Sequence, residues 1–244
     1  MQPGSSLGGA RPKASVTDAA KALYVAKFPS RKDDYDVGLW EHLVHLLAAE
    51  AGICTALTKL ISTGEGHHTL LSRRFDRTQE GRRIHFASAM TLLGLTDGDD
   101  AATGYGYLDI VDFILRGCTD VDANLRELYR RVAYSICIGN SDDHFRNHGF
   151  LLTPKGWTLS PAYDMNPTLN DHQSLLISAS SNKSDLGILL DACEDYMLDA
   201  HEARRIITEV VNVTREWRRL AVRLGASKRE MDMFGGVFER EWKY

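Results

Sequence analysis

Two short stretches of the chain carry polar side chains at spacings that could form a catalytic or metal-binding site. Asp142, His144 and Asn147 stand in the run Asp-Asp-His-Phe-Arg-Asn, and Asp164 ends the run Pro-Ala-Tyr-Asp. Phosphoryl transfer requires metal ions that bridge the phosphates and a carboxylate that orients the attacking hydroxyl and accepts its proton. Asn and Asp oxygens suit Mg²⁺. These residues therefore indicate a phosphoryl-transfer site, with Asn147 and Asp164 as metal ligands and Asp142 as the base.

The segment between Asn147 and Asp164 predicts a β-hairpin. Two β-prone runs, at 150–152 and 157–159, flank a turn that contains Pro and Gly. Because a hairpin holds its two ends side by side, this one would bring the two metal ligands together.

Helical spacing of apolar residues predicts a helix over 121–138, capped by Asp120. This helix leads directly into the loop of Asp142 and would fix where that loop begins. We expect further helices at 84–93, 108–116 and 195–224, and a last one from Ser227, where Ser227 and Glu230 form a capping box.

The first part of the chain carries a candidate phosphate-binding region. A Gly- and Ser-rich stretch at 4–13 precedes a β-prone run at 23–28, with Lys27 near its end. Apolar residues then predict an amphipathic helix over 37–51, followed by a strand at 69–72.

Strands become scarce after this point, so we predict an α+β fold of two lobes. A small lobe at 1–78 contains the strands and Lys27, and a mostly helical lobe at 79–244 contains the Asp142 loop. Nucleotide would lie in the cleft between them.

Composition excludes several other classes of protein. With 43% hydrophobic and 25% charged residues over 244 positions, the chain has the composition of an ordinary soluble protein. A net charge of -4 argues against broad nucleic-acid binding, although the basic residues among the first 32 suit a nucleotide triphosphate or a solvated surface. The four cysteines are far apart, and no apolar run approaches a membrane span. We therefore expect a cytoplasmic protein with no membrane contact.

The same motifs also have ordinary interpretations. Clusters of Asp, Asn and Ser mark turns in many proteins, and the helix that ends near Gly139 needs such a turn. The Gly/Ser stretch lacks the Lys-Ser or Lys-Thr pair of a Walker A loop, and by composition alone it is typical of a linker. Lys27 could be a solvated strand-end lysine, and Glu41 an exposed helical charge.

Two histidine pairs, His42 with His45 and His144 with His148, have spacings that could bind a transition metal. Clear further ligands are missing, so we do not expect zinc. Ser6 lacks the Gly-x-Ser-x-Gly elbow of a serine hydrolase, and we reject that activity.

The order of the parts resembles the HipA family of bacterial toxin kinases. The shared parts, found from Ser6 to about Asp164, are a Gly-rich serine loop, a strand lysine, a helical glutamate, Arg-Phe-Asp-Arg, Asp-x-His-x-x-Asn and Pro-x-Tyr-Asp. The resemblance implies an ATP- and Mg²⁺-dependent serine/threonine kinase, in which Asp142 is the catalytic base and His144 supports the loop or the transferring phosphate.

The resemblance also assigns the nucleotide contacts. It implies that Lys27, positioned by Glu41, contacts the α- and β-phosphates, and that Arg74 and Phe75 lie in the hinge beside adenine. The remaining implied positions are Gly8 and Gly9 in the nucleotide-binding loop and Ser6 as the autophosphorylated serine of that loop. Asp143 stands where a small residue is common in the family, and it is expected to add negative charge beside the base.

The family further implies partners and a longer protein. Typical members have an additional N-terminal subdomain ahead of the serine loop, so we expect a truncated or a short member here. A DNA-binding antitoxin would hold the kinase, and its protein substrate would be a translation factor such as an aminoacyl-tRNA synthetase. Two alternatives stay open, a small-molecule or lipid kinase with the same phosphate machinery and an inactive binding module.

Overall fold

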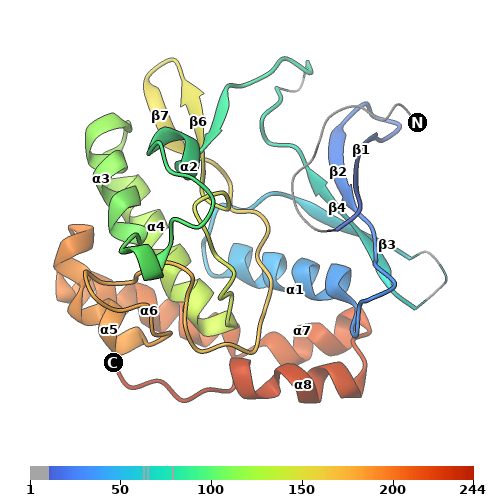
Figure 1. Ribbon diagram of the computed structural model, residues 1–244. Coiled ribbons are helices and arrows are strands. Elements are labelled where there is room, and N and C mark those ends of the chain that lie inside the picture. Colours follow the sequence, from blue (N-terminus) through green and yellow to red (C-terminus); the bar gives the residue numbers. More distant parts are fainter. Residues whose placement is uncertain (1–10, 63, 65, 79) are drawn as a thin grey trace.

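The computed structural model describes residues 11–62, 64, 66–78 and 80–244. Its N-terminal part is a four-stranded antiparallel sheet in the order β1-β2-β4-β3, against which helix α1 packs (Figure 1). The bounds of these elements are Lys13–Thr17 for β1, Leu23–Lys27 for β2, Val37–Glu50 for α1, Thr58–Ser62 for β3 and His68–Arg73 for β4.

The remainder is mostly helical and contains a second antiparallel sheet in the order β5-β6-β7. The strands are β5 (Phe86–Ser88), β6 (Gly149–Thr153) and β7 (Gly156–Leu159). The helices are α2 (Ala89–Leu92), α3 (Tyr107–Gly117), α4 (Val121–Ile138), α5 (Leu186–Asp191), α6 (Ala200–Thr214), α7 (Trp217–Leu224) and α8 (Lys228–Phe238), with short 3-10 turns at Ala101–Thr103 and Cys193–Tyr196.

The C-terminal helices fix the position of α1. Trp40 of α1 is fully buried, and its ring lies 4.4 Å from Phe234 of α8 and 6.0 Å from Trp217 of α7, measured between centroids. Aromatic pairs of this kind add about 0.5–1.5 kcal/mol beyond the area that they bury. Tyr134 of α4 also donates to the carbonyl of Val44 at 2.5 Å. Helix α1, which carries Glu41, is therefore held by the helical part as well as by the sheet.

Local sequence signals predicted most of the elements that surround the site. Strands β2 and β4, helices α1, α3 and α4 and the β6-β7 hairpin form where they were predicted. The capping box of α8 is present, with Glu230 N donating to the Ser227 hydroxyl and Glu230 accepting from Ser227 N. Asp120 occupies the N-cap position of α4, as predicted, and its backbone is in a left-handed conformation. Its side chain makes no capping hydrogen bond to the described first turn of the helix.

Two helix predictions were wrong. Residues 84–93 contain strand β5 followed by the short helix α2, because Phe86 and Ala87 pair with strand β6 and Ser88 then caps α2 by accepting from Thr91 N. The predicted helix over 195–224 begins only at Ala200, because the chain turns left-handed at Met197 (φ 58°), and a turn at 215–216 divides it into α6 and α7. Among the described residues, no helix is both long and apolar enough to cross a bilayer.

Candidate active site

A cavity of about 740 Å³ opens between the N-terminal sheet and the helical part. Side chains from both parts line it, and among them Lys27 and Asp164 meet although they are 137 residues apart in the sequence. Of the residues that the sequence singled out, six line this cavity: Lys27, Arg74, Phe75, His144, Asn147 and Asp164.

Lys27 joins the two parts by ion pairs to two carboxylates. Its Nζ lies 2.5 Å from Glu41 Oε1 on α1 and 2.5 Å from Asp164 Oδ1 beyond the β6-β7 hairpin. The side chains of Lys27 and Glu41 are 11% and 4% exposed, whereas that of Asp164 is 34% exposed toward the cleft. The solvated alternatives considered for Lys27 and Glu41 are therefore wrong, because both side chains are buried against each other.

Burial and charge set the protonation of this cluster. Burial acts to lower the pKa of Lys27, but the two carboxylates outweigh it and raise the pKa above its usual value. Burial acts to raise the pKa of Asp164, but the Lys27 ion pair outweighs it and lowers that pKa. Burial prevails at Glu41, whose pKa is raised in spite of Lys27. Lys27 and Asp164 consequently stay charged at neutral pH.

The loop that carries Asp142 begins at a glycine that no other residue could replace without strain. Gly139 ends α4 in the left-handed region (φ 67°), and a Cβ there would lie 2.7 Å from the carbonyl oxygen of Thr168. Asn140 next accepts from the backbone N–H of Asn166 at 3.2 Å. The loop is thus tied to the segment that follows Asp164.

Asp142 and Asn147 are joined by a short turn. The Asn147 side-chain amide donates to the carbonyl of Asp142 at 3.1 Å, and the Asn147 backbone donates to His144 at 2.8 Å. Asp142 itself is exposed and is absent from the described lining of the cavity. A carboxylate in this place is accessible to a hydroxyl that arrives from solvent.

The residues of the cleft fit a magnesium-bound triphosphate. The side-chain nitrogen of Asn147 is hydrogen-bonded to the Asp142 carbonyl, so its side-chain oxygen is left for a metal ion. Oxygen is the ligand atom that Mg²⁺ prefers. Asp164 adds a charged oxygen from the opposite side of the hairpin, in a left-handed conformation (φ 58°) that aspartate tolerates better than most residues. Lys27 supplies a charge for phosphate oxygens.

Three aromatic side chains, Phe75, Phe86 and Tyr163, line another part of the cleft and are called the aromatic wall below. The ring of Phe75 lies 5.8 Å from Phe86 and 5.6 Å from Tyr163, and Tyr163 donates to the Arg146 carbonyl at 2.5 Å. Three rings of this kind can enclose a flat base. Sequence reasoning gave no role to Phe86 or Tyr163. Only the position of Tyr163 next to Asp164, in the Pro-Ala-Tyr-Asp run, could have pointed to Tyr163.

Other predicted and missed side chains also border the cleft. Arg74 donates twice to Asp76, from Nε at 2.8 Å and from Nη2 at 2.5 Å, so its guanidinium braces the turn after β4. Lys13, opposite Lys27 in the β1-β2 register, lines the cavity, and the sequence singled it out only as one of the basic residues among the first 32. His144 lines the cavity as well, and its Nδ1 is buried with no hydrogen-bond partner among the residues that the structure describes.

The carboxylate of Asp143, which was expected to add negative charge beside the base, is buried and does not line the described cleft. The side chain turns inward and accepts from the hydroxyl of Tyr107 at 2.7 Å. His148 lies on the same carboxylate, with Nε2 at 3.1 Å from Oδ1. Asp143 and Asp142 thus point to different environments although they are neighbours in sequence.

The histidine pairs do not form metal centres in the part of the chain that the structure describes, where no group of three or more His, Cys, Asp or Glu residues is placed to hold an ion. His42 Nδ1 instead lies 2.7 Å from the Thr58 hydroxyl. Ser6, Gly8 and Gly9, predicted to form the nucleotide loop, lie outside the described residues.

His45 supports a prediction about acid stability. It is fully buried, both ring nitrogens are without hydrogen-bond partners among the described residues, and burial lowers its pKa to about 3. The unfolded chain binds a proton at this histidine below about pH 6.5 and the folded chain does not, so stability falls as the pH drops from 6.5 toward 3. Between pH 7 and pH 5 the loss is expected to be about 2 kcal/mol.

Urea unfolding of wild type and His45→Leu at the two pH values measures this contribution. The substitution should remove most of the loss, whereas His201→Leu on the exposed surface of α6 should keep it. Equal pH dependence in wild type and His45→Leu would show that His45 is not the group responsible.

Comparison with solved structures places the fold among kinases. The chain superimposes on a structure of the toxin-antitoxin complex of HipA, HipB and operator DNA from Shewanella oneidensis MR-1 with a TM-score of 0.77 and 17% identity, over 98% of this chain and 63% of that one. It superimposes on the Helicobacter pylori proinflammatory kinase CtkA with a TM-score of 0.56 and 15% identity, over 91% and 95% of the two chains. The predicted two-lobed, kinase-like α+β fold is confirmed.

The model of the HipA-like C-terminal domain matches residues 5–217, and the chain belongs to this family. Two curated relatives are each 28% identical. They are the "Putative kinase" of Haemophilus influenzae, over 67% of this chain and 52% of the relative, and the "Putative kinase Y4dM" of Sinorhizobium fredii, over 63% and 38%. The chain therefore spans about half the length, or less, of these relatives.

Proposed function

We propose that the chain is an ATP- and Mg²⁺-dependent protein kinase that phosphorylates serine or threonine. One observation carries the proposal: Lys27, Glu41 and Asp164 meet in one ion-pair cluster at a cleft that Asn147 also lines. If these polar residues only formed local turns, there would be no reason for a strand, a helix, a loop and the segment after a hairpin to contribute them to one cleft.

The chain's own residues would share the work of transfer. Asn147 and Asp164 would hold Mg²⁺, which neutralises charge on the phosphates when it is bound. Lys27, kept in place by Glu41, anchors phosphate oxygens. The exposed carboxylate of Asp142 orients the acceptor hydroxyl and takes its proton. Phe75, beside Arg74 in the hinge and facing Tyr163, packs on the base of the nucleotide.

Several finer assignments belong to the same proposal. The lobe boundary falls near residue 78, His144 supports the transferring phosphate, and Ser6 is autophosphorylated in a loop formed with Gly8 and Gly9. The structure from Shewanella contains HipB and operator DNA, which supports a DNA-binding antitoxin as partner here. The kinase would act in the cytoplasm on a protein such as an aminoacyl-tRNA synthetase.

The experiment offers labelled ATP and Mg²⁺ to the protein with two acceptor pools, whole-cell lysate and a metabolite extract. We expect acid-stable label on Ser or Thr of proteins. Label confined to small molecules would assign a metabolite or lipid kinase instead. No Mg-ATP binding by calorimetry in folded protein would indicate an inactive binding module.

Asp164→Asn is expected to weaken Mg-ATP binding about 10- to 100-fold, because a neutral amide replaces a charged metal ligand and the net worth of a charge-assisted contact is about 1.5–3 kcal/mol. Titration of Mg-ATP at several Mg²⁺ concentrations measures this loss. Asp191→Asn, at the exposed end of α5, is the matched control and should bind as wild type does. Unchanged metal dependence in Asp164→Asn would remove Asp164 from the site.

A further inference from the structure

Three consecutive residues at the start of the catalytic loop have contrasting environments. Asp142 is exposed, whereas Ser141 before it and Asp143 after it are 6% and 4% exposed. The two neighbours of the proposed base are therefore both anchored in the protein, and the base between them is the residue that faces solvent. An anchored backbone on both sides restricts where the Asp142 carboxylate can point.

The anchor on the Asp143 side is a buried polar cluster. Asp143 Oδ2 accepts from the Tyr107 hydroxyl at 2.7 Å and from the Ser135 hydroxyl at 3.2 Å, and Oδ1 lies 3.1 Å from His148 Nε2. The rings of Tyr107 and His148 also meet edge to face, with centroids 5.6 Å apart. These groups come from α3, from α4 and from the residue just before β6, so one carboxylate connects three elements to the loop.

A buried carboxylate is costly unless its partners compensate it. Burial acts to raise the pKa of Asp143, but His148 and the hydroxyl donors outweigh it and lower that pKa, so the group stays charged. Buried charges of this kind are weak contributors to stability, but the fixed geometry of the groups around them can specify a unique arrangement. This property suits a residue that sets the position of a loop.

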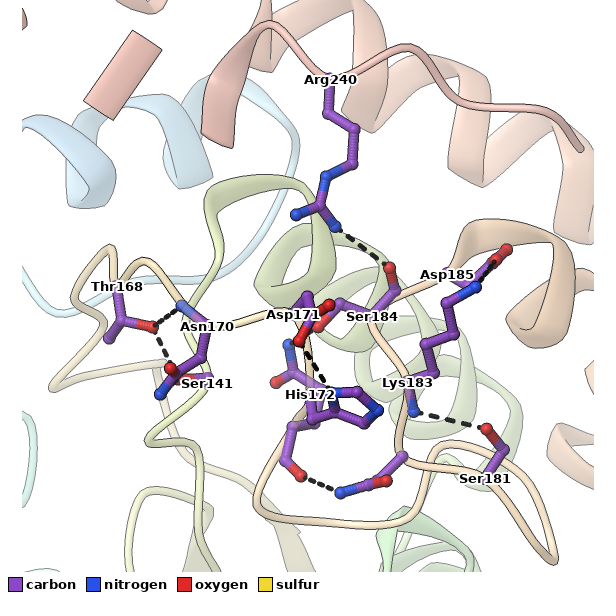
Figure 2. A network of polar contacts seen from close by, with 12 residues as sticks. Ser141, Thr168, Asn170, Asp171, His172, Ser181, Lys183, Ser184, Asp185 and Arg240 are labelled. Atoms are coloured by element: carbon purple, nitrogen blue, oxygen red, sulfur yellow. Dashed lines mark hydrogen bonds and ion pairs between the residues drawn. The ribbon is translucent and has the colours of Figure 1, made fainter. Parts of the chain in front are cut away.

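The anchor on the Ser141 side reaches the segment after Asp164. The Ser141 hydroxyl lies 2.6 Å from the Thr168 hydroxyl, as Figure 2 shows. It also accepts from the Asn170 side-chain amide at 3.3 Å. The Ser141 carbonyl accepts from both the backbone and the hydroxyl of Ser174, at 3.0 and 2.8 Å. The backbone on the Ser141 side of Asp142 is thus held as well.

We propose that Asp143, held by Tyr107 and His148, and Ser141, held by Thr168 and Ser174, are positioning residues that fix the backbone of Asp142 for attack by the acceptor hydroxyl. The inference rests on the proposed function, because it assigns how that site keeps its base in place. It predicts that loss of either anchor lowers the rate of transfer and leaves Mg-ATP binding intact, since the anchors do not line the nucleotide cleft.

Tyr107→Phe tests the Asp143 anchor by removing one hydroxyl. Small displacements of a catalytic group can cost up to about 100-fold in rate, so we expect transfer at saturating Mg-ATP to slow about ten-fold. Tyr129→Phe is the matched control. Tyr129 is also fully buried, and its hydroxyl donates to the Leu189 carbonyl at 3.1 Å, away from the loop. The Tyr129→Phe variant should lose a similar amount of stability to Tyr107→Phe and keep the wild-type rate of transfer.

Ser141→Ala tests the second anchor, with Ser184→Ala as its control. Ser184 is a buried serine of the same irregular region and accepts from the Gln173 amide at 2.9 Å. We expect Ser141→Ala to slow transfer at saturating Mg-ATP, with unchanged affinity by calorimetry, and Ser184→Ala to match wild type. Equal rate losses in each variant and its control would mean that the anchors serve folding alone and would overturn the inference.

Hydrogen exchange separates failure of this inference from failure of the proposed function. Peptides covering 139–147 should exchange faster in Tyr107→Phe and Ser141→Ala than in the two controls, whether or not an acceptor is known. A wild-type protein that labels neither proteins nor small molecules would reject the kinase proposal, and the inference with it. A wild type that labels protein, with loop exchange and rate unaltered in both anchor variants, would reject the inference alone.

Discussion

Asp142→Asn is expected to slow phosphoryl transfer about 10²- to 10⁴-fold, the usual worth of a positioned general base. An amide cannot take the proton of the acceptor hydroxyl, whereas it has nearly the same size as the carboxylate. Because Asp142 is exposed and its side chain is outside the described lining of the cavity, the substitution should leave Mg-ATP affinity nearly intact. Initial rates of protein labelling, together with calorimetric titration of Mg-ATP, give both quantities.

The control for Asp142→Asn is Asp232→Asn, another exposed aspartate, which lies on α8. It should keep both rate and affinity. Complete loss of ATP binding in Asp142→Asn would contradict the role of Asp142 as a base that acts on the hydroxyl. A wild-type rate would remove Asp142 from the mechanism altogether.

Lys27→Met is expected to have the largest effect on stability. It leaves the carboxylates of Glu41 and Asp164 without their cation, and removal of one partner of a buried ion pair costs about 3–5 kcal/mol. Mg-ATP affinity should fall as well, because the phosphate-binding charge is lost. Urea unfolding and calorimetry measure the two effects, with Lys59→Met, an exposed lysine of the same sheet, as control.

The pH dependence of Lys27→Met gives a further test of the cluster. Burial already raises the pKa of Glu41, and loss of Lys27 should raise it more. A carboxyl whose folded pKa lies above its unfolded value gives stability that is present below about pH 4.5 and is lost as the pH rises through the folded pKa. The deficit of Lys27→Met relative to wild type should therefore grow from pH 5 to pH 8. A deficit independent of pH would show that Glu41 does not take up the proton.

Local patterns in the sequence were sufficient for the elements that carry the site. The apolar spacing of α1 and α4 and the turn residues of the β6-β7 hairpin are short-range signals, and all three elements form where they were predicted. They place Glu41 on α1, Asp142 in the loop after α4, and Asp164 just beyond the β6-β7 hairpin. The meeting of Glu41 and Asp164 at Lys27 depends on how the two parts pack, which short-range signals do not encode.

The wrong predictions have a common physical origin in contacts between distant segments. Residues 84–93 contain apolar side chains at helical spacing, but Phe86 and Ala87 gain strand pairing with β6, some 60 residues later. Asp143 was expected to add negative charge beside the base, but its side chain is buried. Its inward orientation requires the hydroxyl of Tyr107, 36 residues earlier, and no local feature of the loop signals that contact.

The aromatic wall was missed for the same reason. Phe75, Phe86 and Tyr163 come from three separate segments and become neighbours only after the sheets have paired. A glycine predicts local structure more reliably where the backbone conformation excludes other residues. Gly139, at the end of α4, marks a backbone turn that both closes the helix and starts the loop of Asp142.

A crystal structure with Mg²⁺ and a non-hydrolysable ATP analogue tests the central claim most directly. We predict a metal ion bound by the Asn147 amide oxygen and the Asp164 carboxylate, phosphates beside Lys27, and the γ-phosphate facing Asp142. An analogue bound outside the cleft, or a metal ion that contacts neither Asn147 nor Asp164, would contradict the account.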